Sequence, residues 1–320
     1  MLEPILCTFV AMQIQSKPSN ISIIVAFLAI YIIWGSTYTG IKYAIQSIPP
    51  LLMSGIRYFI AGLILYLFAL AKGAPKPTMQ HWKNTTIIGA LLLLVGNGAV
   101  ASAEMLIPSG IAALIVCSVP IWFALFAWLF FKRGKPGAKT IIGIVIGFAG
   151  ILVLVGPGAI LNTGIGINPI GVAIITFGTI GWSIGSLYAS KASLPSNHIT
   201  TTGMQMLTGG ALLIIAGIAN GETAQFHPLL VSKHSIMALI YLIIFGSMIA
   251  FSAYGWLMRV VAPSLVSTYA YVNPVIAVFL GWFFFNEPID KFTIIGSLII
   301  IVALILITTS KPIVKEEIPE

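Results

Sequence analysis

Long apolar runs separated by short polar breaks make up most of the chain. A helix that crosses a bilayer needs about 20 mostly apolar residues, and ten runs of roughly that length occur in the sequence. We predict membrane-spanning helices, counted from the first to the tenth span, at Ile21 to Tyr38, Leu51 to Ala71, Ile87 to Met105, Ser109 to Phe131, Thr140 to Ala159, Ile170 to Ala189, Thr201 to Ala219, Ile236 to Met258, Leu265 to Phe285 and Phe292 to Thr309.

The runs are apolar on every face, which distinguishes them from the strands of a membrane barrel. Leu91 to Val95 and Ile299 to Ile307 contain no polar residue, whereas barrel strands alternate apolar and polar positions. Backbone polar groups in hydrocarbon must be paired internally, and helices pair them within one segment. The expected fold class is therefore an all-α integral membrane protein with ten transmembrane helices.

The composition agrees with a bilayer as the main solvent. Apolar residues make up 58% of the 320 residues, and the mean hydropathy is +1.05. Only 8% of the residues are Asp, Glu, Lys or Arg, against about a quarter in a typical soluble domain. A soluble fold is excluded, because too few charged side chains are available to cover its surface.

The basic residues fall mainly on one side of the predicted bilayer. Arg57 lies within a span, and Lys42, Lys233 and Lys291 fall on the opposite side. The majority side holds Lys17, Lys72, Lys76, Lys83, Lys132, Arg133, Lys135, Lys139, Lys191, Arg259, Lys311 and Lys315. The positive-inside rule predicts that this side is cytoplasmic and that both termini lie there. A nucleic-acid surface is excluded, because these charges are spread over short loops.

Two stretches of the chain repeat each other. Pro120–Gly143 and Pro274–Gly296 both place Trp eight residues after Pro, followed by Phe-Phe, a polar turn and Thr-Ile-Ile-Gly. The offset is 154 residues, falling to 153 after the turn. A weaker match at an offset of 148 pairs Trp34 with Trp182, Arg57 with Gln205 and Gly62 with Gly210.

Each half holds five predicted spans, so the second copy must enter the membrane upside down. The matched turns carry opposite charge, since Lys132, Arg133 and Lys135 stand where the second copy has Glu287 and Asp290. Opposite charge is what the positive-inside rule requires of matched turns on opposite faces. Inverted repeats are a recurrent architecture of secondary transporters, in which the binding site lies between the halves near the midplane.

These features resemble EamA-type carriers of the drug/metabolite transporter superfamily over about residues 21 to 310. The resemblance rests on the ten spans, the half-repeat and the runs Tyr31–Tyr38, Pro108–Leu114, Ser267–Pro274 and Asn286–Pro288. It implies a bacterial inner-membrane permease or exporter of small metabolites with a central cavity, but no particular substrate. Such carriers often keep an acidic Glu-x-Pro turn in both halves, whereas here the first half has Arg133, so the role of that Glu is carried over to Glu287 alone.

Enzyme and pump functions lack the residues that they need. No P-loop occurs, and no loop is long enough to form a nucleotide-binding domain. Gly181-Trp-Ser183-Ile-Gly185 matches a nucleophile elbow, but Ser183 lies in an apolar helix and every His lies in a loop, so we reject a hydrolase. We expect no cofactor and no metal. A secondary transporter is the main hypothesis, and a passive channel or facilitator for a small solute is the alternative.

Polar and aromatic residues within the spans are candidates for the walls of the cavity. Ionisable and polar groups at membrane depth are costly, so a function is their default interpretation. The candidate substrate-binding residues are Trp34, Tyr38, Arg57, Asn97, Trp122, Trp182, Gln205, Tyr254, Tyr269, Tyr271 and Asn273. Pro120 and Pro274, each of which removes a helical hydrogen bond, are candidate hinges.

Two charged residues have alternative interpretations. Arg57 lies about two turns inside the second span, where it either binds an anionic group of the substrate or holds helices together through hydrogen bonds to carbonyl groups. Glu104 ends the third span, where it is either a proton-coupling carboxylate or a solvated residue of the outer loop. Protons are therefore a possible partner beside the small-molecule substrate and the lipid bilayer.

The expected organisation is two five-helix repeats between two cytoplasmic tails. The tails are residues 1–20 and 311–320, and the repeats are residues 21–159 and 168–310. Residues 1–11 lack the basic region of a secretory signal, and we hypothesise that Met12 is the natural start. Cys7 and Cys117 are too far apart in sequence to suggest a disulfide framework or metal-ligand spacing. We expect a monomer or a loose homodimer in the inner membrane.

Overall fold

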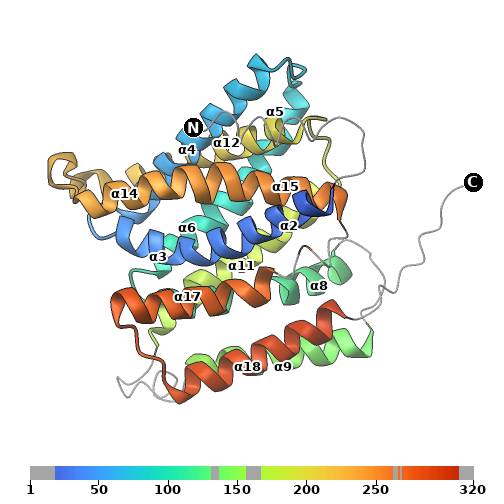
Figure 1. Cartoon of the computed structure of the whole chain (residues 1–320), viewed down its shortest axis with the longest axis vertical. Coiled ribbons are helices and arrows are strands. Elements are labelled where there is room, and N and C mark those ends of the chain that lie inside the picture. The colour runs from blue at the N-terminus through green and yellow to red at the C-terminus, as the bar shows by residue number, and fades with distance from the viewer. Residues whose placement is uncertain (1–18, 131–136, 156–166, 262–265, 267–268, 310–320) are drawn as a thin grey trace, which may run out of the picture.

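The computed structural model describes residues 19–130, 137–155, 167–261, 266 and 269–309, and its regular elements there are helices (Figure 1). The first half contains α2 (Asn20–Leu28), η1 (Ala29–Ile33), α3 (Trp34–Ala44), α4 (Pro50–Ala71), α5 (Met79–Gly89), η2 (Ala90–Asn97), α6 (Gly98–Ala103), α7 (Ser109–Val116), α8 (Val119–Leu129) and α9 (Ala138–Val155). The second half contains α11 (Pro169–Ala189), α12 (His198–Ala219), α13 (Glu222–Gln225), η3 (Pro228–Leu230), α14 (Lys233–Tyr241), η4 (Leu242–Ile249), α15 (Ala250–Val260), α17 (Tyr269–Phe285) and α18 (Lys291–Thr308).

Helices occupy most of the described part of every predicted span, which confirms the all-α membrane fold class. Among the described residues, seven helical segments are long and apolar enough to cross a membrane, and three shorter apolar helices lie in the fifth, ninth and tenth spans. Large apolar side chains such as Val145, Phe177 and Phe283 are more than 60% exposed. A bilayer explains this exposure, because lipid chains solvate such side chains at no cost.

The contacts between helices follow the inverted repeat. Counterpart spans pack against each other, as α4 does with α12, α7 with α17, and α9 with α18. In addition, α3 packs on α14 and α17, and its counterpart α11 packs on η2 and α8. Figure 1 shows α9 and α18 side by side at the lower edge of the bundle. The two halves therefore interlock rather than form separate domains.

Glycines allow the second and seventh spans to pack with their backbones in contact. A Cβ atom on Gly203 would lie 2.7 Å from the backbone nitrogen of Tyr66, and one on Gly210 would overlap the backbone of Phe59. Gly62, the repeat mate of Gly210, faces the backbone of α12 in the same way. Small residues bring membrane helices this close, where van der Waals contacts and weak hydrogen bonds hold them.

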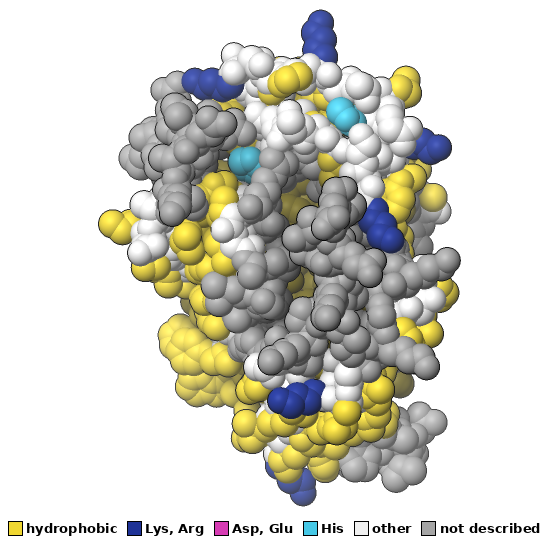
Figure 2. Space-filling view, turned by 90° about the vertical axis from the view of Figure 1, so that its right-hand side faces the viewer, with side chains coloured by type: hydrophobic (Ala, Val, Ile, Leu, Met, Phe, Trp, Pro, Cys, Tyr) yellow, Lys and Arg dark blue, Asp and Glu magenta, His cyan; other side chains and the backbone are white. Residues whose placement is uncertain are grey.

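The two ends of the bundle differ in charge. Glu104, Glu222, Glu287 and Asp290 lie at one end, which we call the acidic end. The opposite end, which we call the basic end, carries Lys72, Lys76, Lys83, Lys139 and Lys191. Figure 2 views this basic end, where Lys and Arg side chains are visible and no Asp or Glu appears among the described residues.

Two carboxylates of the second half cap helices of the first half at the acidic end. Glu222 accepts hydrogen bonds from the backbone N–H groups of Leu51 (3.2 Å) and Leu52 (2.8 Å) at the start of α4. Glu287 accepts from the N–H of Ser109 (2.8 Å), the hydroxyl of Ser109 (2.9 Å) and the N–H of Gly110 (3.3 Å) at the start of α7. Carboxylates stabilise helix N-termini, so these caps fasten the two halves together.

The candidate hinges differ from each other in structure. Pro274 lies inside α17, as predicted from the sequence. Pro120 lies in the first turn of α8, because the fourth span is interrupted between Val116 and Val119. A proline in the first turn of a helix removes no intrahelical hydrogen bond, so Pro120 does not free a carbonyl group as we expected. Residues 1–18 of the N-terminal tail, the C-terminal tail and the turn with Lys132, Arg133 and Lys135 lie outside the described residues, and α2 begins at Asn20, the last residue of the predicted N-terminal tail.

Candidate functional site

A cavity of about 90 Å³ lies inside the bundle and is lined by residues of both halves. It offers space for several water molecules. Its described walls are Trp34, Thr37, Tyr38, Ile41, Arg57, Tyr58, Gly96, Asn97, Val100, Val116 and Val119 from the first half, with Gly178, Thr179, Trp182, Phe251, Tyr269 and Asn273 from the second. Most of these residues lie in the middle of their spans, near the expected midplane of the bilayer.

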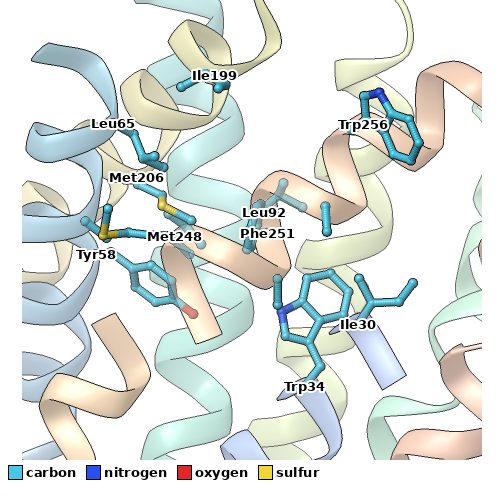
Figure 3. Close-up of a cluster of buried hydrophobic side chains, with 14 of the residues drawn as sticks. Ile30, Trp34, Tyr58, Leu65, Leu92, Ile199, Met206, Met248, Phe251 and Trp256 are labelled. Atoms are coloured by element: carbon cyan, nitrogen blue, oxygen red, sulfur yellow. The ribbon is translucent and has the colours of Figure 1, made fainter. Parts of the chain in front are cut away.

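Trp34 is the centre of the aromatic wall. Its ring lies 5.8 Å from that of Phe251, 5.1 Å from that of Tyr254 and 5.1 Å from that of Tyr269, measured between centroids. Its Nε1 donates a hydrogen bond to the carbonyl of Gly246 at 3.3 Å. Figure 3 shows Trp34 and Phe251 in one buried cluster with Tyr58. Tilted and edge-on ring pairs of this kind hold their geometry better than aliphatic contacts do.

Three π-helical segments bring backbone irregularity to the cavity. The first, η1, directly precedes Trp34, η2 carries Gly96 and Asn97, and η4 carries Gly246 and Ser247. The offset of 154 residues maps η2 onto residues 244–251, which overlap η4, so the feature is part of the repeat. Such insertions occur frequently at functional sites, because they redirect side chains and loosen helical hydrogen bonds.

Two asparagines of the cavity wall form hydrogen bonds with neighbouring polar groups. Asn97 accepts a hydrogen bond from the hydroxyl of Tyr58 at 2.7 Å and donates to the carbonyl of Leu92 at 3.1 Å. The amide nitrogen of Asn273, when turned to face its neighbours, donates to the carbonyls of Tyr31 (3.1 Å) and Tyr269 (3.2 Å). Asn273 thus joins the irregular first span to α17, the helix that contains Pro274.

Arg57 brings a positive charge to the cavity wall. Its side chain is 3% exposed, and its Nε donates to the Ser247 hydroxyl at 2.7 Å. The guanidinium lies 4.6 Å from the centre of the Tyr58 ring, a cation–π distance. Among the described residues, no carboxylate comes within 4.0 Å of it and no acceptor meets its terminal nitrogens.

Glu104 is fully buried rather than solvated. Neither carboxylate oxygen has a hydrogen-bond partner. Lys42 donates to the backbone carbonyl of Glu104 at 2.8 Å instead of to its carboxylate. Lys42, Glu287 and Arg57 are the charged groups that act on this carboxylate electrostatically. Of the two alternatives for Glu104, the solvated outer loop is therefore wrong, because the residue is enclosed by protein.

The structure brings seven of the predicted binding residues to the cavity. They are Trp34, Tyr38, Arg57, Asn97, Trp182, Tyr269 and Asn273. Three others lie outside its described walls. Trp122 packs on Phe126 and Phe148. The backbone carbonyl of Gln205 lies beside Gly89 of α5, in the third span, and the ring of Tyr254 packs on that of Trp34. The side chain of Tyr271 is outside the described part of the chain.

Several residues of the site were missed by our sequence analysis. Phe251 lies 154 residues after Asn97, so the repeat offset itself points to it. Thr37 and Thr179 lie three residues from Trp34 and Trp182, on the same faces of their helices. Ser247 carries no signal in the sequence, because only the fold brings the eighth span beside Arg57.

Comparison with known proteins gives a family match in both halves. The sequence matches the description "EamA-like transporter family" over residues 20–156 and again over residues 169–309. The chain is 40% identical over 291 residues to the Escherichia coli K12 protein called "Uncharacterized inner membrane transporter YedA", covering 89% of this chain and 90% of that protein. It is 26% identical to the Bacillus subtilis "Uncharacterized transporter YvbV", covering 92% and 93% of the two chains.

Two further similarities are weaker in sequence. The Dickeya dadantii protein PecM is 26% identical over 278 residues, covering 86% of this chain and 88% of that protein. A crystal structure of another protein superposes with a TM-score of 0.61 at 20% identity, covering 90% of this chain and 96% of that chain. At this identity the superposition shows a shared fold and nothing further.

Proposed function

Because this chain belongs to the EamA-like transporter family, within the drug/metabolite transporter superfamily, we propose that it is a secondary transporter that moves a small metabolite by alternating access. The observation that carries the proposal is the cavity, which both halves line. Inverted repeats with a midplane site between them are suited to rocking, in which the site opens to each side in turn.

The polar contacts at the acidic end support a state of the alternating-access cycle in which this end is closed. Beside the caps formed by Glu222 and Glu287, the hydroxyl of Ser235 donates to the carbonyl of Tyr43 at 2.8 Å. The Ser36 and Tyr241 hydroxyls share a hydrogen bond of 2.5 Å. All four contacts cross between the halves, so they close this end. The positive-inside rule makes it the outer end, with the basic end and both termini in the cytoplasm.

As a working hypothesis, we propose export, or exchange linked to protons, of a small amphipathic metabolite. The aromatic wall around Trp34 and the scarcity of fixed charge support an amphipathic substrate.

The test is transport by the purified protein in proteoliposomes. Amino acids, nucleosides and cationic drugs would be presented with and without a pH gradient, and exchange would be measured by counterflow. We expect saturable uptake of at least one solute that is accelerated by unlabelled solute on the opposite side, because a carrier reorients faster when it is loaded. Single-channel conductance steps in place of counterflow would support a passive channel or facilitator and contradict the proposal.

A further inference from the structure

The cavity contains one fixed charge among its described walls, and that charge is positive. No Asp or Glu is among the described wall residues, and Arg57 is the cation. Resting on the proposed transport function, we propose that the cavity recognises an organic monocarboxylate whose carboxylate is bound by the terminal nitrogens of Arg57. The apolar body of the same molecule lies against the aromatic wall around Trp34.

The free donors of Arg57 are the first support. The Nε is committed to Ser247, while the two terminal nitrogens have no acceptor in the described structure. A buried charge that lacks a counter-ion and has only part of its donors hydrogen-bonded is costly. A bound anion would relieve that cost, so the site is incomplete without one.

The position of the guanidinium is fixed by its neighbours. Ser247 holds one edge, and the Tyr58 ring lies 4.6 Å from Cζ. At Gly246 an added Cβ would lie 2.8 Å from Nη2, so the absence of a side chain there allows the guanidinium to lie against η4. A guanidinium group that is held in one orientation loses little conformational entropy when it binds a planar carboxylate.

The charge balance favours a carboxylate over a phosphate. A guanidinium and a carboxylate match in geometry through two parallel hydrogen bonds. A phosphomonoester carries nearly two negative charges at neutral pH, and no second cation is among the described wall residues. One Arg neutralises one carboxylate, whereas a dianion would leave a buried negative charge.

The other residues of the cavity wall limit the size and shape of the apolar part of the ligand. Trp182 and Phe251, whose ring centroids lie 6.0 Å apart, flank the cavity together with Trp34. Asn97 and Thr179 are the polar side chains that could meet a hydroxyl or a carbonyl of the ligand. With about 90 Å³ of space, the present conformation suits a body no larger than about one ring.

The experiment compares three ligands that share a phenyl ring and differ in the polar group attached to it. 3-Phenylpropanoate, its neutral amide and phenyl phosphate would be titrated against the purified wild-type protein by tryptophan fluorescence and thermal shift. We expect the carboxylate to bind about 10- to 100-fold more tightly than the amide, the range given by hydrogen bonds to a charged group. Phenyl phosphate that binds more tightly than the carboxylate would overturn the assignment of a monoanion.

Variants then connect the preference to Arg57. In Arg57→Gln the carboxylate and the amide should bind within about threefold of each other, because the charge that separates them is gone. Ser247→Ala keeps the charge and releases its anchor, so a reduced but measurable preference is expected even if Arg57→Gln fails to fold. Lys233→Gln, at an exposed position of the acidic end, is the control that retains the full preference. An unchanged preference in both cavity variants would overturn the proposal.

The same ligands separate this inference from the proposed function. Counterflow of the amide or of a cationic solute, with no binding of the carboxylate, would support secondary transport and contradict recognition of a monocarboxylate. Binding of the carboxylate without counterflow of any solute would support the inference and contradict secondary transport.

Discussion

Glu104 places a carboxylate in the protein interior with no hydrogen bond to either oxygen. An ionised carboxylate without hydrogen bonds is costly to bury, so Glu104 suits the role that we propose for it, in which it takes up a proton and releases it again. Arg57 acts on Glu104 electrostatically, which links the coupling candidate to the charge on the cavity wall.

Replacing Glu104 by Gln should remove the response to a pH gradient while counterflow continues. Gln has the same shape as Glu but cannot exchange a proton. Uptake into proteoliposomes with and without a pH gradient measures the effect, and the gradient-driven component should fall to the background level.

The matched control is Glu222→Gln, since Glu222 is also buried but its carboxylate is satisfied by backbone N–H groups. If Glu104→Gln retains the wild-type response to the gradient, Glu104 is not the coupling group.

Residue types and depths were predictable from the sequence, but the direction of each side chain was not. Trp34, Arg57 and Asn97 were selected because they are aromatic or polar in apolar runs, and all three line the cavity. Trp122 satisfied the same criterion, yet it faces Phe148, because the face that a helix buries depends on partners distant in sequence. The repeat mates Arg57 and Gln205 diverge for the same reason.

At the scale of elements, the second and seventh spans pack with their backbones in direct contact. Their backbones meet at Gly62, Gly203 and Gly210, where no atom of a flexible side chain is available to move aside. The pair crosses from one half to the other, so its geometry constrains how the halves move.

Gly210→Ala should destabilise the protein by about 1 to 3 kcal/mol or more, the usual cost of overpacking a tight interior. The added methyl group would overlap the backbone of Phe59. Unlike a side chain, the backbone cannot move aside by changing its rotamer. Thermal unfolding in detergent, followed by gel filtration, measures the loss.

Gly255→Ala provides the control, because its new Cβ would meet only the Thr202 hydroxyl at 3.6 Å. Alanine is the better helix former by about 1 kcal/mol, so this variant should be as stable as the wild type or more so. Equal melting temperatures for both variants would show that the close contact does not limit stability.

The helices themselves were predictable because an apolar run in hydrocarbon must pair its own backbone groups. Their interruptions were not. The π-helical segments η1, η2 and η4 lie in sequences as apolar as their surroundings, and the break between Val116 and Val119 contains no glycine. Pro120 marked the break, but its place in the first turn of α8 rather than within a helix depends on packing.

At the scale of the whole molecule, the inverted repeat is symmetric in its helices and asymmetric in its charges. Glu287 of the second half caps α7 of the first half. The repeat places Arg133 at the matched sequence position in the first half, and a cation cannot accept hydrogen bonds from helix N–H groups. By sequence, therefore, this type of cap belongs to the acidic end alone.

Glu287→Ala should favour opening of the acidic end. Loss of hydrogen bonds to a charged group shifts a two-state equilibrium by about tenfold or more. Ile41 lines the cavity towards this end, so Ile41→Cys, with both native cysteines replaced, can report opening in intact cells. Its reaction with a membrane-impermeant maleimide should accelerate in the Glu287→Ala background.

Asp290→Ala is the matched control, because Asp290 caps α18 of its own half through Thr293 and closes nothing between the halves. Equal acceleration by the two substitutions would attribute the effect to general loosening of that end and not to the cap.

The inverted arrangement could be inferred from the odd number of spans and the opposite charges of the matched turns. The contacts that join the halves at the acidic end, such as that of Ser235 with Tyr43, could not, because they join residues up to 192 positions apart. Charge patterns in a sequence define which side a segment occupies, whereas a conformational state is a choice between two sets of distant contacts.

The two caps have a kinetic consequence. Glu222, in α13, and Glu287, in the turn between α17 and α18, belong to two different connections of the second half, and they hold two different helices of the first half. If each half moves as a rigid body, both caps must break in one event, and neither can ease the release of the other. Opening is then a concerted step with a high activation enthalpy, so the turnover rate should rise steeply with temperature while substrate affinity changes little.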